Sequence, residues 1–270
     1  MSSMKHMSDL LHGYRGIIDR RLACFRNHLS LAGVLLLASI AGGLTLTGLM
    51  MRSRDAAMRR ELLEQTQLMA SAIPGNLVRA LSGTSDDLVR PEYLRLQKQL
   101  EILQQQMPHI RYLYLARRLA DGAIIFLVEN EPAVAEDYSP RGVLYEEATP
   151  AFAHAIQHGH ELIEGPDSDR WGTWISALAP IADPQTGEHL CSFGADIAAA
   201  DWYARIIRHG IPGLATTLLL AVIIVLAPRL CERFRPQHRL LLKYPGPWPT
   251  VLLAGLLLTA FFGWHSYLSE

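Results

Sequence analysis

The sequence predicts an α+β domain, with an antiparallel five-stranded sheet and a long N-terminal helix, attached to three transmembrane α-helices. Three long apolar runs in a chain of 270 residues predict the spans. Between the first two runs, segments with helical periodicity come first and short strand-like segments follow, and this order is typical of an α+β fold. The formal net charge of −1 excludes both a basic nucleic-acid surface and a disordered acidic chain as interpretations of the whole protein.

The first apolar run, residues 29–51, contains no charged side chain and is long enough for a helix to cross the roughly 30 Å core of a bilayer. Because a polar and basic segment, residues 1–28, precedes it, we expect a retained anchor and not a cleaved signal peptide. Two shorter runs predict a second span over residues 211–228 and a third over residues 249–265, for which a re-entrant segment is the alternative. Trp264 stands where an interfacial aromatic residue is typical.

The orientation follows from the basic residues of the loop between the second and third spans. This loop, residues 229–248, contains five Lys and Arg residues against the single acid Glu232. Such loops face the cytoplasm, and the basic segment 1–28 agrees. We therefore expect residues 52–210 to form an extracytoplasmic domain and residues 266–270 an extracytoplasmic tail.

The first part of the outer domain is predicted to be helical. Residues 55–69 begin a helix whose apolar side chains recur every three to four residues, and Pro74 then interrupts it. Shorter helices are predicted over residues 76–81 and 92–106. The apolar stripe of the first helix favours a dimer seam over burial on the domain's own sheet. Its members are Met58, Leu62, Leu68, Met69 and Ile73.

Five strands and one inserted helix are predicted next. Residues 110–117 and 123–129 are rich in β-formers and flank Asp121-Gly122, a hairpin signal. Helical spacing returns over residues 145–158. The remaining strands are predicted over residues 161–164, 171–181 and 188–197, with a second hairpin loop between the last two, and a helix over residues 201–208 then runs into the second span.

Several of these segments resemble the Cache family, the extracytoplasmic PAS-like sensor domains of bacterial transmembrane receptors, in its single-domain form. Between Gly165 and Trp202, the segments GPDSDRWGTWISALAPI, DPQTG and GADIAAADW are similar to the end of the sheet and the exit helix in sensor histidine kinases and diguanylate cyclases. YLYLARRLADG and FLVENEPAVAEDYSPRGVLYEEA are similar to the first hairpin and the loop that covers the pocket. The resemblance covers residues 52–208.

The resemblance implies a receptor of the bacterial inner (cytoplasmic) membrane, with its PAS-like sensor domain in the periplasm or outside. It implies a small-molecule ligand (an organic acid, an amine or an amino acid), a homodimer and no nucleic acid. It implies signal transmission to a kinase or cyclase output, as in two-component systems, located beyond residue 270 or on a partner. No catalytic residue and no cofactor are expected. The alternative is a protein-interaction or assembly module without a ligand, and solvent-exposed Trp171 and Trp174 would favour it.

Asp196 is the sharpest candidate for ligand contact. It stands between apolar residues in FGADIAA, at the end of a predicted strand, where an acid is costly to bury without a partner. It is expected to hold a ligand amine, and the alternatives are that it caps the following helix or pairs with an internal arginine. Arg170 would serve an acidic ligand in the same way, so the sign of the ligand's charge stays open.

Aromatic residues complete the predicted site, because small-ligand pockets are largely apolar with a few placed polar groups. Trp171 and Thr173 share one strand face, and Trp174 lies on the other. The predicted ligand-binding set is Tyr112, Tyr114, Phe126, Tyr138, Tyr145, Arg170, Trp171, Thr173, Trp174 and Asp196.

Two further features are interpreted without a function. His154, His158 and His160 form H-x₃-H-x-H, but no cysteine or third helical ligand accompanies them, so a polar helix end is preferred to a metal site. Cys191 lies in an apolar run and is expected to be buried as a packing residue.

Overall fold

The computed structural model describes residues 2–130, 144–233 and 255. The chain divides into two compact units, Arg52–Arg208 and a second unit composed of Met1–Met51 and His209–Glu270. The helices α1 (Ser2–Ser71) and α5 (Ala199–Arg233) each have residues in both units.

Two helical segments are long and apolar enough to cross a membrane, Gly33–Ser71 of α1 and Ala199–Leu226 of α5. They contain most of the first two predicted spans, residues 33–51 of the first and 211–226 of the second. Of the third span, residues 249–265, the structure describes Gly255 alone, so that span stays a prediction. Within this unit small residues allow the two helices to lie close together, because a Cβ on Gly43 would collide with Thr217.

The unit Arg52–Arg208 contains a five-stranded antiparallel sheet in the order β2-β1-β5-β4-β3, which confirms the predicted α+β class. Its strands are β1 (Tyr112–Arg118), β2 (Ile124–Glu129), β3 (Leu162–Asp169), β4 (Gly172–Ala182) and β5 (His189–Ala198). The central strand β5 pairs with β1 on one side and β4 on the other. The C-terminal end of β5 leads directly into α5.

Two predicted elements differ from the structure by several residues at one end. The helix predicted over residues 145–158 begins only at Pro150, as α4 (Pro150–His158), because Thr149 caps it by accepting a hydrogen bond from the Phe152 backbone N–H. The strand predicted over residues 161–164 continues to Asp169. Its pairing with β4 is irregular between Glu164 and Asp167, and regular antiparallel pairing resumes from Asp167 to Asp169.

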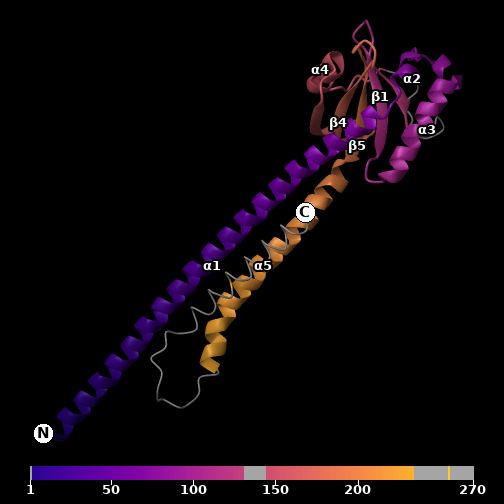
Figure 1. Cartoon of the computed structure of the whole chain (residues 1–270). Coiled ribbons are helices and arrows are strands. Elements are labelled where there is room, and N and C mark those ends of the chain that lie inside the picture. Colours follow the sequence, from indigo (N-terminus) through magenta and orange to yellow (C-terminus); the bar gives the residue numbers. More distant parts are fainter. Residues whose placement is uncertain (1, 131–143, 234–254, 256–270) are drawn as a thin grey trace. The chain divides into compact units, whose positions relative to one another are not determined.

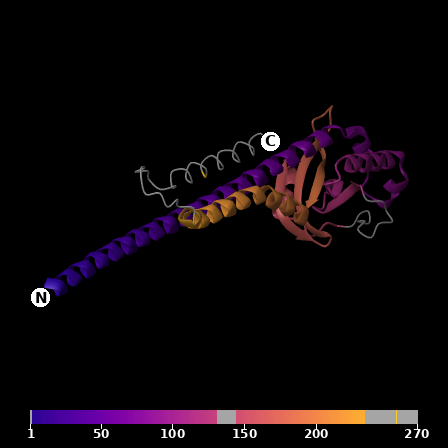
Figure 2. The ribbon, with the colours of Figure 1, turned by 90° about the horizontal axis from the view of Figure 1, so that it is seen from below.

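Helices cover both faces of the sheet. α4 packs on one face through Phe152, Ala155 and Ile156, and α2 (Gly75–Arg79) and α3 (Pro91–Gln106) lie on the other side of the sheet (Figure 1, Figure 2). The apolar stripe of α1 is buried within this same chain at Met58, Leu62, Met69 and Ile73, and only Leu68 is exposed. The interpretation of this stripe as a dimer seam is therefore wrong, since its side chains fill the domain's own core.

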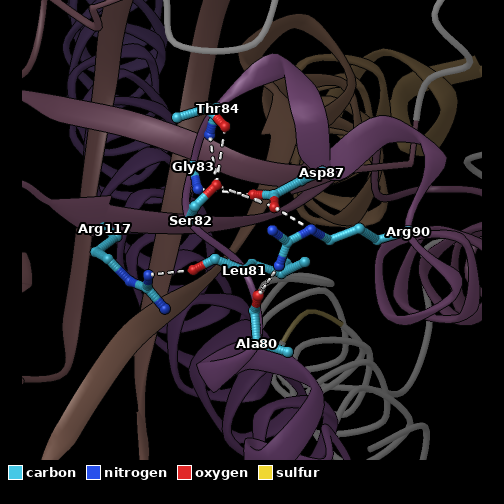
Figure 3. A network of polar contacts seen from close by, with 8 residues as sticks. All are labelled: Ala80, Leu81, Ser82, Gly83, Thr84, Asp87, Arg90 and Arg117. Carbon is cyan, nitrogen blue, oxygen red and sulfur yellow. Dashed lines mark hydrogen bonds and ion pairs between the residues drawn. The ribbon is translucent and has the colours of Figure 1, made fainter.

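A polar network fixes the segment that joins α2 to α3 (Figure 3). The buried Asp87 lies in a 3₁₀ turn, η1 (Ser85–Val89), and accepts hydrogen bonds from the Gly83 backbone N–H at 2.7 Å and the Ser82 hydroxyl at 3.1 Å. The Arg90 guanidinium forms an ion pair with it at 3.4 Å. From β1, the Arg117 guanidinium donates to the Leu81 carbonyl at 2.9 Å. The segment is thereby attached to the sheet by hydrogen bonds and not by apolar contact alone.

Candidate functional site

A row of polar side chains crosses the sheet on the face that α4 covers. Tyr112 pairs with Asp196, Asp196 pairs with Ser176, and Ser176 pairs with Glu164. Residues paired directly across neighbouring antiparallel strands project from the same face. Four strands thus place one phenol, two carboxyl groups and one hydroxyl side by side.

This row forms part of the wall of a cavity of about 60 Å³. Since a single water needs roughly 10–15 Å³ on such a measure, the cavity has space for several waters or one small molecule. The wall combines aromatic rings with carboxyl groups, and none of its described residues is a lysine, arginine or histidine. The lining residues are Tyr112, Leu113, Tyr114, Phe126, Glu129, Tyr145, Glu147, Thr149, Phe152, Glu164, Asp167, Ser168, Asp169, Trp171, Trp174, Ser176 and Asp196.

Asp196 is the most buried of the six carboxyl groups in this wall, with 9% of its surface exposed. The Tyr114 hydroxyl donates a hydrogen bond to Asp196 Oδ1 at 3.1 Å, and the Ser176 hydroxyl also hydrogen-bonds to it. Burial raises the pKa of Asp196 to about 7, although both hydroxyl groups act in the opposite direction. Within the described residues, no cation forms an ion pair with it.

Gly194 makes the contact between Tyr114 and Asp196 possible. Gly194 pairs with Tyr114 across β1 and β5, and the Tyr114 ring lies over its Cα, where a Cβ would collide with the ring. Any other residue at this position would push the ring away and move its hydroxyl from the carboxylate. Burial and the adjacent Asp196 both raise the pKa of Tyr114, so the phenol stays protonated and acts as a donor.

Aromatic rings enclose the space in front of Asp196. Phe126 contacts the Tyr114 ring edge-to-face at 5.0 Å between centroids and the Tyr145 ring at 5.2 Å. Trp171 stacks with Tyr145 at 6.2 Å. Trp174 contacts the Tyr112 ring edge-to-face at 5.0 Å. These contacts fix the rings, so their faces and edges form a preorganised wall.

Asp169 organises the turn between β3 and β4 that carries the two tryptophans. Its Oδ1 accepts hydrogen bonds from the Trp171 backbone N–H at 2.8 Å and from the Trp174 indole N–H at 3.0 Å. Its Oδ2 accepts from the Tyr145 hydroxyl at 3.3 Å. Burial and this neighbouring carboxylate raise the pKa of Tyr145. Asp169 therefore shapes the wall as well as adding charge to it.

Glu164 connects the cavity to α4. Its carboxylate accepts a hydrogen bond from the Thr149 hydroxyl, with 2.8 and 3.0 Å to its two oxygens, and the same hydroxyl caps α4. Partial burial raises the pKa of Glu164. A group that binds to Glu164 would therefore act on the start of this helix.

Most of the predicted ligand-binding residues meet at this cavity, although their contact with a ligand stays a prediction. The lining includes seven of them: Tyr112, Tyr114, Phe126, Tyr145, Trp171, Trp174 and Asp196. Arg170 does not line it and instead forms a two-point ion pair with Glu147 at 2.6 and 2.7 Å. The Thr173 hydroxyl hydrogen-bonds to Ser168 at 2.8 Å and lies outside the lining. Tyr138 lies outside the described residues.

Five lining acids were not in the predicted set, and they decide the charge of the cavity. They are Glu129, Glu147, Glu164, Asp167 and Asp169. The alternation along β4 placed Trp174 and Ser176 on one face, but only the pairing of β4 with β3 shows that Glu164 lies on that face too. Trp174 is buried and Trp171 is half-buried, so the exposed tryptophans that would favour an interaction module are not found. Cys191 is buried, as predicted, and burial raises its pKa to about 12.

Comparisons with known proteins return sensory domains. No family model and no protein of curated function matches the chain. Among solved structures, the ligand-binding domain of the Campylobacter jejuni chemoreceptor Tlp3 in complex with L-valine is 12% identical, with a TM-score of 0.42, over 65% of this chain and 66% of that one. The ligand-binding domain of the Pseudomonas aeruginosa amino-acid chemoreceptor PctC in complex with GABA is 17% identical, with a TM-score of 0.31, over 56% and 68%.

A third match is the periplasmic domain of RsbU from Chlamydia trachomatis, at 16% identity and a TM-score of 0.30, over 58% of this chain and 56% of that one. The chain spans less than two thirds of the length of the Tlp3 domain. The Tlp3 and PctC matches are ligand-binding domains of chemoreceptors, and the RsbU match is a periplasmic domain. At such identities and TM-scores, the function must be argued from the site itself.

Proposed function

We propose that the unit Arg52–Arg208 is the sensor domain of a membrane receptor and that it binds a small cationic amine in the cavity, with Asp196 as the counterion. The observation that carries this proposal is the composition of the wall. Six carboxyl groups and a set of aromatic rings line the cavity, and no cationic side chain does so among its described residues. An ammonium group is the chemistry that matches both components.

The state of Asp196 supports a cationic ligand in particular. A buried carboxylate with two hydroxyl donors and no cation is poorly stabilised, which is why its pKa rises to about 7. An ammonium ligand would supply the absent positive charge and favour the ionised form. An organic acid would instead add a negative charge to a wall with six acids, of which Glu147 is ion-paired with the cation Arg170. Of the three ligand classes expected from the sequence, the amine is therefore favoured, and the acid is not.

The rings in front of Asp196 give a second reason. A cation within about 6 Å of an aromatic centroid is attracted by the ring face, by roughly 0.5 to 2 kcal/mol depending on desolvation. Tyr114, Tyr145 and Trp171 all belong to this wall and are held in place by contacts with Phe126. The wall therefore offers a cation both a counterion and π-faces without rearrangement.

A polar junction connects the cavity wall to the helices at both ends of the domain, and we assign transmission to it. The Arg59 guanidinium donates to the Gly165 carbonyl at 3.0 Å, one residue after the lining residue Glu164. It also pairs with Asp55 at 3.1 Å and lies over the Trp202 ring. The Trp202 indole N–H donates to Asp55 at 2.8 Å. A ligand that shifts β3 would thereby change contacts of α1 and α5 together.

Calorimetric titration of the full chain in detergent micelles tests the proposal. The ligands are a short primary alkylamine, a diamine, a quaternary ammonium, an amino acid and a dicarboxylic acid. We expect binding within the amine classes and none by the dicarboxylic acid. Asp196→Asn should weaken amine binding about a hundredfold, because it removes the buried counterion.

Asp86→Asn is the matched control, since Asp86 is exposed and lies outside the cavity lining. It should leave the affinity unchanged. Binding of the dicarboxylic acid alone, or an amine affinity that is equal in Asp196→Asn and the parent chain, would overturn the proposal.

A further inference from the structure

A second group of side chains lies on the outer surface of α4, away from the cavity. His154 and His158 are four residues apart on this helix, so they share one of its faces, and His160 follows the helix end. All three side chains are exposed, whereas Phe152 and Ile156 are buried on the opposite face. The helix therefore presents one face to the cavity region and another, with histidines, to solvent.

The C-terminal end of α4 explains why the third histidine joins the other two. Gly159 has a left-handed backbone conformation, with φ of 65°, and ends the helix. The chain then turns back, and the His160 backbone N–H donates to the Ala155 carbonyl at 3.0 Å. The ring centroids lie 4.5 Å apart for His154 and His158, 5.5 Å for His154 and His160, and 5.8 Å for His158 and His160.

These separations suit three imidazoles on one metal ion. With Zn–N bonds of about 2.0–2.1 Å and tetrahedral angles, the centres of three coordinating rings lie roughly 5 Å apart. We propose that His154, His158 and His160 form a three-nitrogen site for a divalent transition-metal ion, with Zn²⁺ as the reference ion and water in the fourth position. This site is independent of the amine cavity.

As the side chains stand, no three His, Cys, Asp or Glu residues in the described part of the chain are arranged to hold a metal ion. The rings of the trio must therefore rotate to point their nitrogens at one ion. All three are exposed, and within the described residues none of the three rings takes part in a hydrogen bond that would have to break. The backbone already supplies the spacing, so only side-chain torsions need to change.

The chemistry of the three ligands determines the expected selectivity. Neutral imidazole favours Zn²⁺, Cu²⁺ and Ni²⁺, with Cu²⁺ bound most tightly of the three. Mg²⁺ and Ca²⁺ prefer oxygen ligands and should not compete. This ranking separates a three-histidine site from a nonspecific attraction of cations to the acidic cavity, which would not discriminate against Mg²⁺.

The test is a Zn²⁺ titration of the full chain in detergent micelles, purified through a tag without histidine and stripped of metal by a chelator. The parent chain, His158→Ala and His109→Ala are compared, because the chain has 11 histidines and the others contribute a background. His158→Ala should lower the affinity for one equivalent of Zn²⁺ by about a hundredfold or more. The loss of a direct ligand costs at least as much affinity as the loss of a residue that supports a ligand. His109→Ala should have no effect, and Mg²⁺ should give no binding.

A spectroscopic readout distinguishes coordination from a general change in charge. The Cu²⁺ complex of the parent chain should show an electron paramagnetic resonance spectrum with three nitrogen ligands, reduced to two in His158→Ala. Unchanged thermal unfolding of the variant shows that it is folded. The proposal is overturned if the parent chain binds no Zn²⁺, or if His158→Ala binds as many equivalents as the parent with equal affinity. Neither result bears on the amine cavity.

Discussion

Two buried carboxyl groups on different parts of the same domain have opposite surroundings. Asp87, with 2% of its surface exposed, accepts a backbone N–H and a hydroxyl and forms an ion pair with Arg90. Asp196, with 9% exposed, has two hydroxyl donors and, within the described residues, no cation. Asp87 lies in a close-packed turn, whereas Asp196 faces a cavity.

The difference shows how to separate a structural acid from a binding acid. Burying a charge is costly unless it is both paired and hydrogen-bonded, and the chain meets both conditions at Asp87. Asp196 is hydrogen-bonded but, within the described residues, is not paired with a cation. The cavity beside it has space where a cation would fit. A buried acid that lacks a counterion beside an aromatic cavity is therefore the better candidate for ligand contact.

The largest expected difference between the two acids is in their contribution to the stability of the folded chain. Asp87→Asn removes the negative charge that Arg90 and the Gly83 N–H face, so the donors of a buried turn are left with a weaker acceptor. Asp87 is buried but the Arg90 side chain is exposed, so the main loss is the weaker acceptor for buried donors, which costs about 2 kcal/mol, or roughly 4–8 °C in Tm for a domain of this size. Thermal unfolding of the ligand-free chain, followed by near-ultraviolet circular dichroism, measures it.

Two variants control for this result. Asp86→Asn, at the exposed neighbour, should leave Tm unchanged. Asp196→Asn at pH 8 should leave Tm equal or higher, because it removes a charge that burial disfavours. Equal destabilisation by Asp87→Asn and Asp196→Asn would break the distinction between the two acids.

The second expected effect is a pH dependence of amine binding that arises mainly from Asp196. Because its pKa is raised to about 7, the carboxylate that an ammonium ligand needs is protonated in mildly acidic solution. Amine affinity should be constant above pH 8 and fall about tenfold for each unit of pH below 7. Titrations of the parent chain between pH 5 and 9 measure this. Asp196→Asn should have a weak affinity with a much smaller pH dependence, since Glu164, whose pKa is also raised, still titrates in the wall.

Linkage predicts the opposite direction for the stability of the ligand-free chain. The folded chain holds the Asp196 proton more tightly than the unfolded chain does, because its pKa is raised. The stabilisation from this group is therefore full below about pH 4 and is lost as the pH rises through 7. A wild-type amine affinity that does not change between pH 5 and 9 would contradict the assignment of Asp196 as the counterion.

Local patterns were sufficient to predict the strands and the central acid of the site. Runs of β-forming residues and the Asp121-Gly122 turn predicted β1 and β2, because both signals lie within a few residues in the sequence. Asp196 was found because an acid between apolar residues is conspicuous. Features that depend on one residue's immediate neighbours can be predicted in this way.

Features that depend on pairing between distant segments could not be predicted. Glu164 belongs to the site only because β3 pairs with β4 in a register that crosses an irregularity at Gly165. Whether the stripe of α1 would bury in its own chain or against a partner depends on which surfaces the sheet leaves uncovered. The negative charge of the cavity is a sum over four segments of chain, and no single motif contains it.

The smallest expected effect follows from removing the tyrosine hydroxyl that donates to Asp196. Tyr114→Phe removes the hydroxyl that donates to Asp196 Oδ1 but keeps the ring that contacts Phe126. One hydrogen-bond donor to an ion contributes about 1.5 kcal/mol, so amine affinity at pH 7 should fall roughly tenfold. The pH below which affinity declines should also move upward, because the ionised form of Asp196 has lost a donor. Tyr203→Phe, on the exposed surface of α5, is the matched control and should change neither quantity. An affinity loss in Tyr114→Phe without any shift in the pH profile would mean that the hydroxyl contacts the ligand directly, and Asp196 would then need another donor.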